Sequence, residues 1–324
     1  GADPYDIRDI GPAFLYPPPA LFVIEAFNVS ESPDVRSLLF LGTNIAVILF
    51  ILHSIHTHFG YSAREVWFWY PLVLFFAPFL ATLHLGQINL ITGLGIVLFF
   101  TAMLPWLAAM GLALAVITKI TPVAFLFYSI VRRDRQTLLY TLLALGLVVA
   151  ASLLRYGWPL HITYLDVFRD LLDVLPISQN SQSFVSKVWM VFQPSISPSI
   201  VQRVFLLYLG LLVLASGILA YRTGDSVPLF IVLGLAVAAS PNVMWYHHFV
   251  FLLPPLLIWM AWQNLEMGLV LWVIAGLLVV QIDYYYLTTG FLSHLFVQFS
   301  ILRVIIQQYS KLRVSEMARS VSAA

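Results

Sequence analysis

Residues 112–124 read LALAVITKITPVA, an apolar run interrupted at 118–122 by a lysine, two threonines and a proline. Proline removes a backbone donor and its ring clashes with the preceding helical turn, so a helix cannot run through Pro122. The stretch therefore predicts two short apolar helices joined by a break that holds Lys119. Broken helices of this kind occur in membrane proteins where the break lines a cavity.

The composition of the whole chain agrees with a membrane location. The 324 residues are 61% hydrophobic and 10% charged, and the mean hydropathy is +0.92. Soluble domains carry about 25% charged residues, and several apolar runs here approach the roughly 20 residues that span a bilayer. We predict an all-α fold, a polytopic transmembrane helical bundle. A net charge of +1 argues against a nucleic-acid partner, and the absence of cysteine excludes disulfides and thiolate metal sites.

Hydropathy predicts a series of apolar helices, some too short for a full crossing. They cover 38–54, 67–83, 88–104, 106–118, 121–131, 136–153, 200–220, 227–240, 246–262, 268–287 and 291–309. The segment 14–29 is expected to lie on the membrane surface or to be re-entrant. Residues 1–309 are expected to form a single multi-pass domain, followed at 310–324 by a polar cytoplasmic tail that frays.

The Lys and Arg residues predict the orientation, because they are enriched in cytoplasmic loops. The strongest cluster is Arg132, Arg133 and Arg135. Counting helices from this cluster places several polar turns together on the non-cytoplasmic face. These turns are 14–19, 84–89, 118–122, 177–183 and 240–248. Because unrelated turns have no reason to share a face and be rich in Gln, Asn, Lys and His, we predict one outward-facing site.

The outer loop 154–199 contains an expected amphipathic helix at 161–175. Apolar residues such as Ile162 and Leu165 recur at three-to-four residue spacing, and Asp166 and Arg169 occupy the other face. Two interpretations stay open. The helix is either a lid on the membrane surface, or it aims a carboxylate at a substrate.

Lys119 is the first candidate site residue. A lysine at mid-bilayer costs roughly 2.5–3.5 kcal/mol on insertion scales, which favours a functional role. The alternative is that its side chain reaches the interface and binds nothing. A helix beginning near Pro122 would offer its N-terminal dipole to the same ligand, so we favour an anion site.

His247 and His248 are the next candidates, after Asn242 at the same outer mouth. Neighbouring helical residues point about 100° apart, so both cannot ligate one metal from an ideal helix. Hydrogen bonding or proton handling at an anionic substrate is the favoured role, and a structural interfacial histidine is the alternative. The amide-rich turns around Gln87 and Asn180 are weak signals alone and gain weight from their shared face.

Several of these stretches occur in an order that resembles a known family. They are FLYPPPALFV (14–23), LGQINL (85–90), GLALAVITKITP (111–122), QNSQS (179–183) and SPNVMWYHHFVFLLP (240–254). From residue 1 to about 262 the chain is similar to glycosyltransferase family 87, integral-membrane enzymes of the GT-C superfold. The resemblance implies a GT-C-like bundle with short or re-entrant helices.

The resemblance also implies a reaction. A polyprenyl-phosphate sugar, typically mannose, would donate its hexose to a lipid or glycan acceptor outside the cytoplasm, at the plasma membrane (the bacterial inner membrane). Lys119 matches the lysine of the family's K-x-x-P turn and would bind the donor phosphate, with His248 and its neighbour His247 beside it. The matching cavity-lining residues would be Tyr16, Gln87, Asn89, Asn180, Ser183 and Asn242.

The sequence departs from the family at its beginning. The family's catalytic acid lies in a D-x-x-x-Y motif, shortly before a G-x-x-P-Y turn that residues 1–5 match. We therefore expect the base upstream of Gly1, since Asp3, Asp6 and Asp9 do not match the motif of the acid. No metal-site residue is predicted, and dependence on a divalent cation stays open, since these aspartates could hold Mg²⁺ or Mn²⁺ only by analogy.

Other functions also fit a broken membrane helix. Transporters of anionic substrates and flippases of lipid-linked sugars use broken helices with buried charges. Such transporters usually show two related halves with polar residues at the midplane, whereas here no repeat is visible and the polar residues share one face. A scaffold without chemistry leaves that clustering unexplained. Arabinofuranosyl transfer is the related enzymatic alternative.

Overall fold

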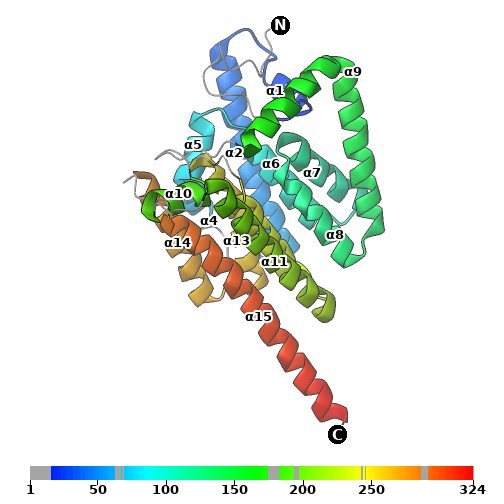
Figure 1. The fold of residues 1–324 in the computed structure, drawn as a ribbon, viewed down its shortest axis with the longest axis vertical. Helices are drawn as coiled ribbons and strands as arrows, with labels where there is room; N and C mark the ends of the chain where they lie inside the picture. The colour runs from blue at the N-terminus through cyan, green and yellow to red at the C-terminus, as the bar shows by residue number, and fades with distance from the viewer. Residues whose placement is uncertain are drawn as a thin grey trace.

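Every regular element that the computed structural model describes is a helix, and together the helices form one bundle (Figure 1). The structure describes residues 16–62, 67, 69–173, 182–192, 197–241, 244, 246–285 and 291–323. The predicted all-α membrane bundle is confirmed. In a bilayer this outcome follows because helices satisfy all their backbone hydrogen bonds internally.

Four helices in the described part of the chain are long and apolar enough to cross a membrane. They are α2 (Pro33–His58), α9 (Arg135–Asp173), α11 (Pro198–Thr223) and α15 (Phe291–Ala323). Shorter apolar helices complete the bundle: α6 (Asn89–Thr101), α7 (Pro105–Thr118), η1 (Thr121–Phe125), α8 (Leu126–Arg132), α12 (Val227–Ala239), η2 (Tyr246–Leu252), α13 (Leu253–Trp262) and α14 (Met267–Tyr285). The small helices α1 (Ala20–Glu25) and α10 (Phe184–Phe192) lie outside these sets.

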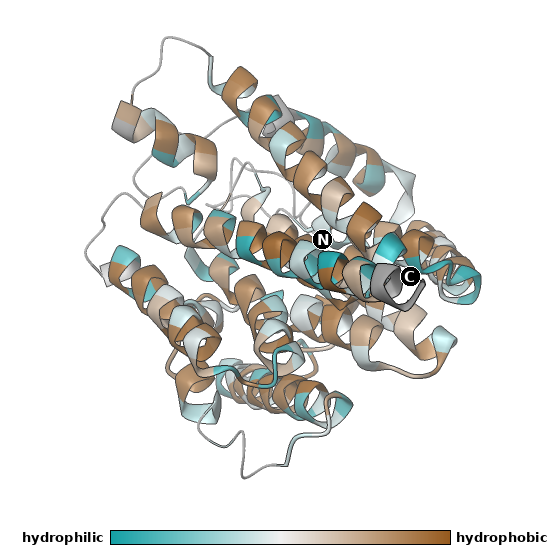
Figure 2. Cartoon of the chain, turned by 90° about the horizontal axis from the view of Figure 1, so that it is seen from below, coloured by the Kyte–Doolittle hydropathy of each residue, from teal (hydrophilic) through white to brown (hydrophobic). Residues whose placement is uncertain are grey.

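The centre of the bundle is formed by helices that are apolar on every side. All residues of α12 from Pro228 to Ala239 are buried, as are those of α13 from Leu253 to Ala261. The long helices instead expose apolar side chains, and Leu207 of α11 is 65% exposed. Apolar residues, in brown, recur along the helices in Figure 2. Outward-facing leucines suit lipid contact, because hydrocarbon chains are as apolar as the protein core.

α9 joins two predicted helices across a corner. Gly157 adopts φ 81° and Pro159 follows, so the ladder of helical hydrogen bonds is interrupted there. The second half of α9 then bends over the end of the bundle, near α1 (Figure 1). At the corner, Arg155 forms a 2.8 Å ion pair with Glu25 of α1. Leu165 and Asp166 are both exposed. Their exposure does not decide whether the second half of α9 is a lid on the membrane surface or aims a carboxylate at a substrate.

Two sequence-based expectations about helix boundaries are wrong. The single span predicted at 67–83 is divided into α4 (Trp69–Leu74) and α5 (Ala77–His84). Pro78 stands in the first turn of α5 and lacks the N–H that a continuous helix would need. The tail beyond residue 309 does not fray, because α15 continues as a helix to Ala323 and projects from the bundle (Figure 1).

α6 and α7 approach each other closely through two glycines. A Cβ atom on Gly95 of α6 would lie 2.4 Å from the carbonyl oxygen of Gly111 on α7. Small residues at such contacts let the backbones of membrane helices pack tightly. This contact fixes the end of α7, where Lys119 follows, relative to the beginning of α6.

Candidate functional site

The helix break that carries Lys119 is held against α6. Lys119 directly follows α7 and has an extended backbone, with φ −159° and ψ 127°, before η1 begins at Thr121. The buried hydroxyl of Thr118 lies 2.9 Å from the hydroxyl of Thr92 on α6. The break predicted at 118–122 is confirmed, and this hydroxyl pair anchors it.

The ammonium group of Lys119 lies over an aromatic ring. Its Nζ is 4.6 Å from the ring centroid of Phe251, which belongs to η2. His248 lies three residues earlier on the same element, and its ring centroid is 6.3 Å from that of Phe251. Because a 3₁₀-helix has three residues per turn, His248 and Phe251 share one face. η2 therefore presents an aromatic ring and an imidazole together beside Lys119.

The two histidines form a compact pair. The ring centroids of His247 and His248 are 4.5 Å apart, and the residues are only 6% and 8% exposed. Both rings are close enough to Lys119 for its charge to act on them. Thr82 of α5 donates to the backbone carbonyl of His247 at 3.3 Å, which ties η2 to α5. The structure thus brings together the three residues that the sequence nominated for phosphate binding.

The turn between α5 and α6 joins the same region. Gly86 takes φ 64°, a left-handed conformation that favours glycine, and the N–H of Gln87 donates to the Thr82 carbonyl at 3.0 Å. The hydroxyl of Tyr16 donates to Oε1 of Gln87. Tyr16 and Gln87, predicted separately as cavity-lining residues, are therefore direct partners.

Asn89 has an unusual amide group. It is the first residue of α6 and is 1% exposed, and its Nδ2 has no hydrogen-bond partner among the described residues. Leaving a buried donor unpaired costs about 1–3 kcal/mol, so this amide is a candidate hydrogen-bond donor to a ligand. Thr92, one turn along the same helix face, touches Thr118. The free donor of Asn89 consequently lies on the face of α6 that meets the break.

Ser183 has a structural partner of its own. It is 1% exposed, and its hydroxyl accepts from the N–H of Ser186 at 3.3 Å, which caps the beginning of α10. Its neighbour Gln182 pairs with the backbone of Met244, three residues before His247. Ser183 is thus linked to the histidine segment through the backbone, and its role in lining the cavity stays a prediction. Asn180 and Asn242 lie outside the described residues, as do Asp3, Asp6 and Asp9.

A metal centre does not emerge from the described residues. Among them, no group of three or more His, Asp or Glu side chains could hold a metal ion. Asp283 of α14, the buried carboxylate nearest to this end, accepts hydrogen bonds from the N–H (2.9 Å) and the hydroxyl of Ser293 in the first turn of α15. Its oxygens therefore stabilise a helix N-terminus. The divalent cation expected by analogy stays a prediction, because the aspartates that would hold it lie outside the described residues.

Sequence reasoning missed Phe251, Thr92 and Thr82 as parts of this site. Phe251 carried a spacing signal, because positions three apart share a face in both α- and 3₁₀-helices, but nothing in the sequence places its ring against Lys119. Thr92 carried a usable signal, because it lies three residues after Asn89 in the same predicted helix. Nothing in the sequence pairs Thr82 with the carbonyl of His247.

Comparison with known proteins gives a family and one annotated relative. Residues 14–241 match the model of glycosyltransferase family 87. Over 296 residues, the chain is 27% identical to a polyprenol-phosphate-mannose-dependent alpha-(1-2)-phosphatidylinositol mannoside mannosyltransferase of Mycobacterium tuberculosis. This alignment covers 83% of the present chain and 67% of the relative. No solved structure matches the chain.

The family match includes Tyr16, Gln87, Asn89 and Lys119, and it ends before the η2 residues of the site. It covers more than half of the chain and agrees with the all-helical membrane fold. The chain belongs to glycosyltransferase family 87.

Proposed function

We propose that this membrane glycosyltransferase moves a hexose, mannose in the first instance, from a polyprenyl-phosphate sugar to a hydroxyl of a lipid or glycan acceptor. The observation that carries the proposal is the position of Lys119 at a helix break beside His247 and His248. A relative whose name specifies polyprenol-phosphate-mannose as donor and a phosphatidylinositol mannoside as acceptor supports the choice of substrates.

In the proposed reaction, the chain's own residues bind and stabilise the donor phosphate. Breaking the bond between the anomeric carbon and the phosphate oxygen leaves additional negative charge on the phosphate. A fixed ammonium group such as Lys119 stabilises this charge without reorganisation, because it is already oriented in the ground state. The free Nδ2 donor of Asn89 and an N–H of His248 would complete the phosphate contacts.

Phe251 has a supporting role in this arrangement. Its ring holds the Lys119 ammonium by a cation–π contact at 4.6 Å, which orients the charge without neutralising it. A carboxylate in the same place would form an ion pair and compete with the phosphate. The aromatic partner therefore leaves the full positive charge for an anionic ligand.

The direct test is a transfer assay in membranes that contain the protein. Radiolabelled polyprenyl phosphate mannose is supplied with extracted phosphatidylinositol mannosides, and membranes without the protein are the control. Labelled glycolipid that forms only with the protein supports the proposal. If no product forms and labelled donor instead moves between leaflets, the protein is a flippase and the transferase proposal fails.

We also propose that the site faces the non-cytoplasmic side of the bacterial inner membrane. The chain has no cysteine, so a single cysteine introduced at an exposed position reports its own accessibility. His84, at the end of α5 near the site, and Arg222, at the opposite end of α11, are both exposed. A membrane-impermeant maleimide added to intact cells is expected to label His84→Cys and to leave Arg222→Cys unlabelled until the cells are lysed. The reverse pattern would overturn the orientation.

Replacing His248 tests the second phosphate contact. His248→Ala removes one hydrogen-bond donor to a charged group, an interaction worth about 1.5–3 kcal/mol. We expect kcat/KM for transfer to fall roughly 10- to 100-fold, measured in the assay above. His53→Ala, at an exposed position of α2, is the matched control and should leave kcat/KM unchanged. Full activity of His248→Ala would exclude His248 from the site.

A further inference from the structure

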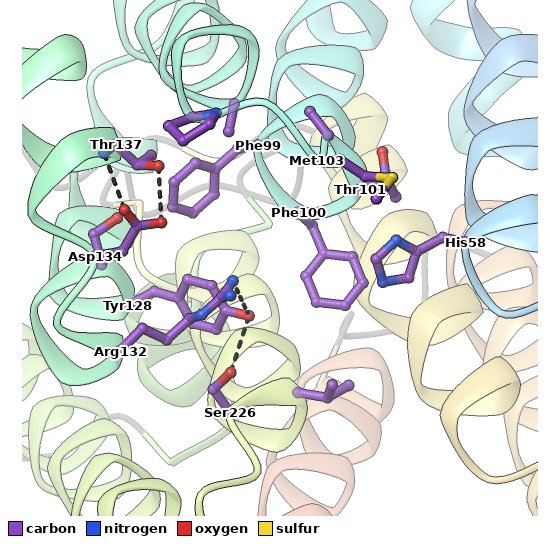
Figure 3. Close-up of a pocket in the computed structure, with 15 residues that line it drawn as sticks. His58, Phe99, Phe100, Thr101, Met103, Tyr128, Arg132, Asp134, Thr137 and Ser226 are labelled. Atoms are coloured by element: carbon purple, nitrogen blue, oxygen red, sulfur yellow. Dashed lines mark hydrogen bonds between the residues drawn. The ribbon is translucent and has the colours of Figure 1, made fainter.

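A second polar region, a cavity, lies at the end of α6 away from Lys119. Figure 3 shows the side chains that line it. Its volume is about 370 Å³. α6 begins in the candidate site with Asn89 and ends with Thr101, which lines this cavity. α7 runs in the opposite direction, from Pro105 in the cavity wall to Thr118 beside Lys119. A helix of the length of α6 spans about 20 Å at 1.5 Å per residue. The cavity is therefore separate from the transferase site.

The wall of this cavity combines a guanidinium group with hydroxyl groups. Arg132 lies over the ring of Tyr128, with 5.3 Å from Cζ to the ring centroid, and its Nη1 is 3.4 Å from the Tyr128 hydroxyl. Ser226 donates to the same hydroxyl at 3.2 Å (Figure 3). Ser129 also lines the cavity and is 2% exposed. These groups can donate several hydrogen bonds to one ligand.

The cavity lining contains one charged group of each sign, Arg132 and Asp134. Asp134 lines the wall, but its two oxygens accept from the N–H (3.0 Å) and the hydroxyl (2.8 Å) of Thr137, which caps the beginning of α9 (Figure 3). Within the described part of the chain, Arg132 forms no ion pair with a carboxylate. His58 also lines the cavity, and its ring is tilted against that of Phe100, with the centroids 5.0 Å apart. The oxygens of Asp134 keep their charge but accept hydrogen bonds at the beginning of α9, whereas the guanidinium of Arg132 has no carboxylate partner among the described residues and can bind an anion.

The surroundings of the cavity indicate an amphiphilic ligand. Met103 lines the cavity and is 95% exposed, and its neighbours Leu104 and Trp106 are about half exposed, at 51% and 50%. Such side chains at the cavity mouth favour contact with lipid, and tryptophan is enriched at membrane interfaces. The Lys and Arg distribution predicts that this end, with Arg132, Arg133 and Arg135, is cytoplasmic.

We propose that this cavity binds the phosphate-bearing headgroup of an anionic membrane lipid. Arg132 and the hydroxyl of Ser129 would contact the phosphate, because a guanidinium group binds phosphate through several parallel hydrogen bonds. The acyl chains would run along the exposed apolar surface at Met103, Leu104 and Trp106. The lipid would enter this cavity from the leaflet opposite the one that contains the sugar donor of the proposed reaction. Its binding does not depend on that reaction.

Native mass spectrometry of the purified chain in detergent tests this assignment. Dioleoyl phosphatidylglycerol is titrated against wild-type protein, Arg132→Gln and Arg132→Lys, and dioleoyl phosphatidylcholine is titrated in parallel. We expect Arg132→Gln to weaken phosphatidylglycerol binding roughly tenfold, from the loss of a charge-assisted contact. Arg132→Lys should lose less, because it keeps the charge. Binding of phosphatidylcholine, which has no net charge, should be weaker and should not change between variants.

Arg133→Gln is the matched control, since it removes the same charge one residue away. Arg133 donates to the hydroxyl of Tyr221 at 2.5 Å and lies over the Tyr221 ring, away from the residues that line the cavity. The affinity of Arg133→Gln for phosphatidylglycerol should stay within twofold of wild type, because Arg133 makes no contact with the lipid in this proposal. Equal losses in Arg132→Gln and Arg133→Gln would overturn the proposal, because they would indicate general charge attraction. Displacement of the lipid by inorganic phosphate at equal concentration would show a site for soluble phosphate and would also overturn the lipid assignment.

Discussion

Replacing Lys119 with methionine is expected to reduce sugar transfer at least a thousandfold. Removing a single preorganised donor from a transition-state charge commonly costs 10²–10³ in kcat, and here the lost group is a full positive charge beside the proposed phosphate. Methionine keeps an unbranched apolar side chain, so the packing around Phe251 is preserved. Because no charge is then placed at bilayer depth, the variant should be at least as stable as wild type. The measurements are kcat/KM in the membrane assay and the thermal unfolding midpoint in detergent.

The controls for Lys119 separate charge from position. Lys119→Arg keeps the charge but brings a larger planar group, so we expect only partial activity. Lys311→Met removes a second lysine that also lies over an aromatic ring, with Nζ 3.7 Å from the centroid of Trp262, on an exposed part of α15. It should leave transfer unchanged. If Lys119→Met kept more than a tenth of wild-type activity, Lys119 would be excluded from the mechanism, because the loss of its charge should cost far more than tenfold in kcat.

Adding one methyl group at Gly95 is expected to destabilise the protein and to impair transfer at a distance from the reacting atoms. The new Cβ would meet the Gly111 carbonyl oxygen at 2.4 Å and the Ala115 backbone nitrogen at 2.8 Å. Both are backbone atoms that cannot rotate away, so α6 and α7 must separate. Overpacking of this kind costs about 1–3 kcal/mol. We expect Gly95→Ala to lower the unfolding midpoint and to reduce kcat/KM at least tenfold, because a shift of about 1 Å in a catalytic group can cost 10²-fold.

Gly146→Ala provides the matched control for Gly95. It makes the same chemical change within α9, at a position where a Cβ would meet nothing within 4 Å. Alanine favours a helix over glycine by about 1 kcal/mol, so this variant should be slightly more stable and fully active. Gly111→Ala, whose Cβ would lie 2.8 Å from the Gly95 carbonyl oxygen, should behave like Gly95→Ala. Wild-type stability of both Gly95→Ala and Gly111→Ala would show that the two helices are not held by this contact.

The membrane bundle was readable from hydropathy because the bilayer leaves a chain few choices. The break at Lys119 was equally readable, because Pro122 lacks a backbone N–H and kinks or breaks a helix that runs into it. The span expected at 67–83 failed for a related reason: the hydropathy of the segment is uniform, and its division depends on Pro78 in the first turn of α5. Hydropathy averages over a window, and a single missing N–H does not change the average.

The site was predicted in part. Lys119, His247 and His248 were nominated by their chemistry and by the face they were expected to share, and the structure places them together. The direct contact of Tyr16 with Gln87 and the capping role of Ser183 were not foreseen. Each depends on the side-chain geometry of residues far apart in the sequence or on the exact beginning of a helix. Asn89 was nominated as a residue of a turn, and only burial shows that its amide donor is unpaired.

The sequence by itself determined the all-helical membrane fold, the helix break at Lys119 and the residue types of the site, because these follow from local rules of hydropathy, proline geometry and charge. Only the tertiary structure decided which aromatic ring faces Lys119, how closely α6 and α7 approach at Gly95 and Gly111, and that a second polar cavity opens around Arg132. These features depend on contacts between helices that are distant in the chain. Such contacts are set by packing in three dimensions, and the period of a single helix carries no information about its neighbour.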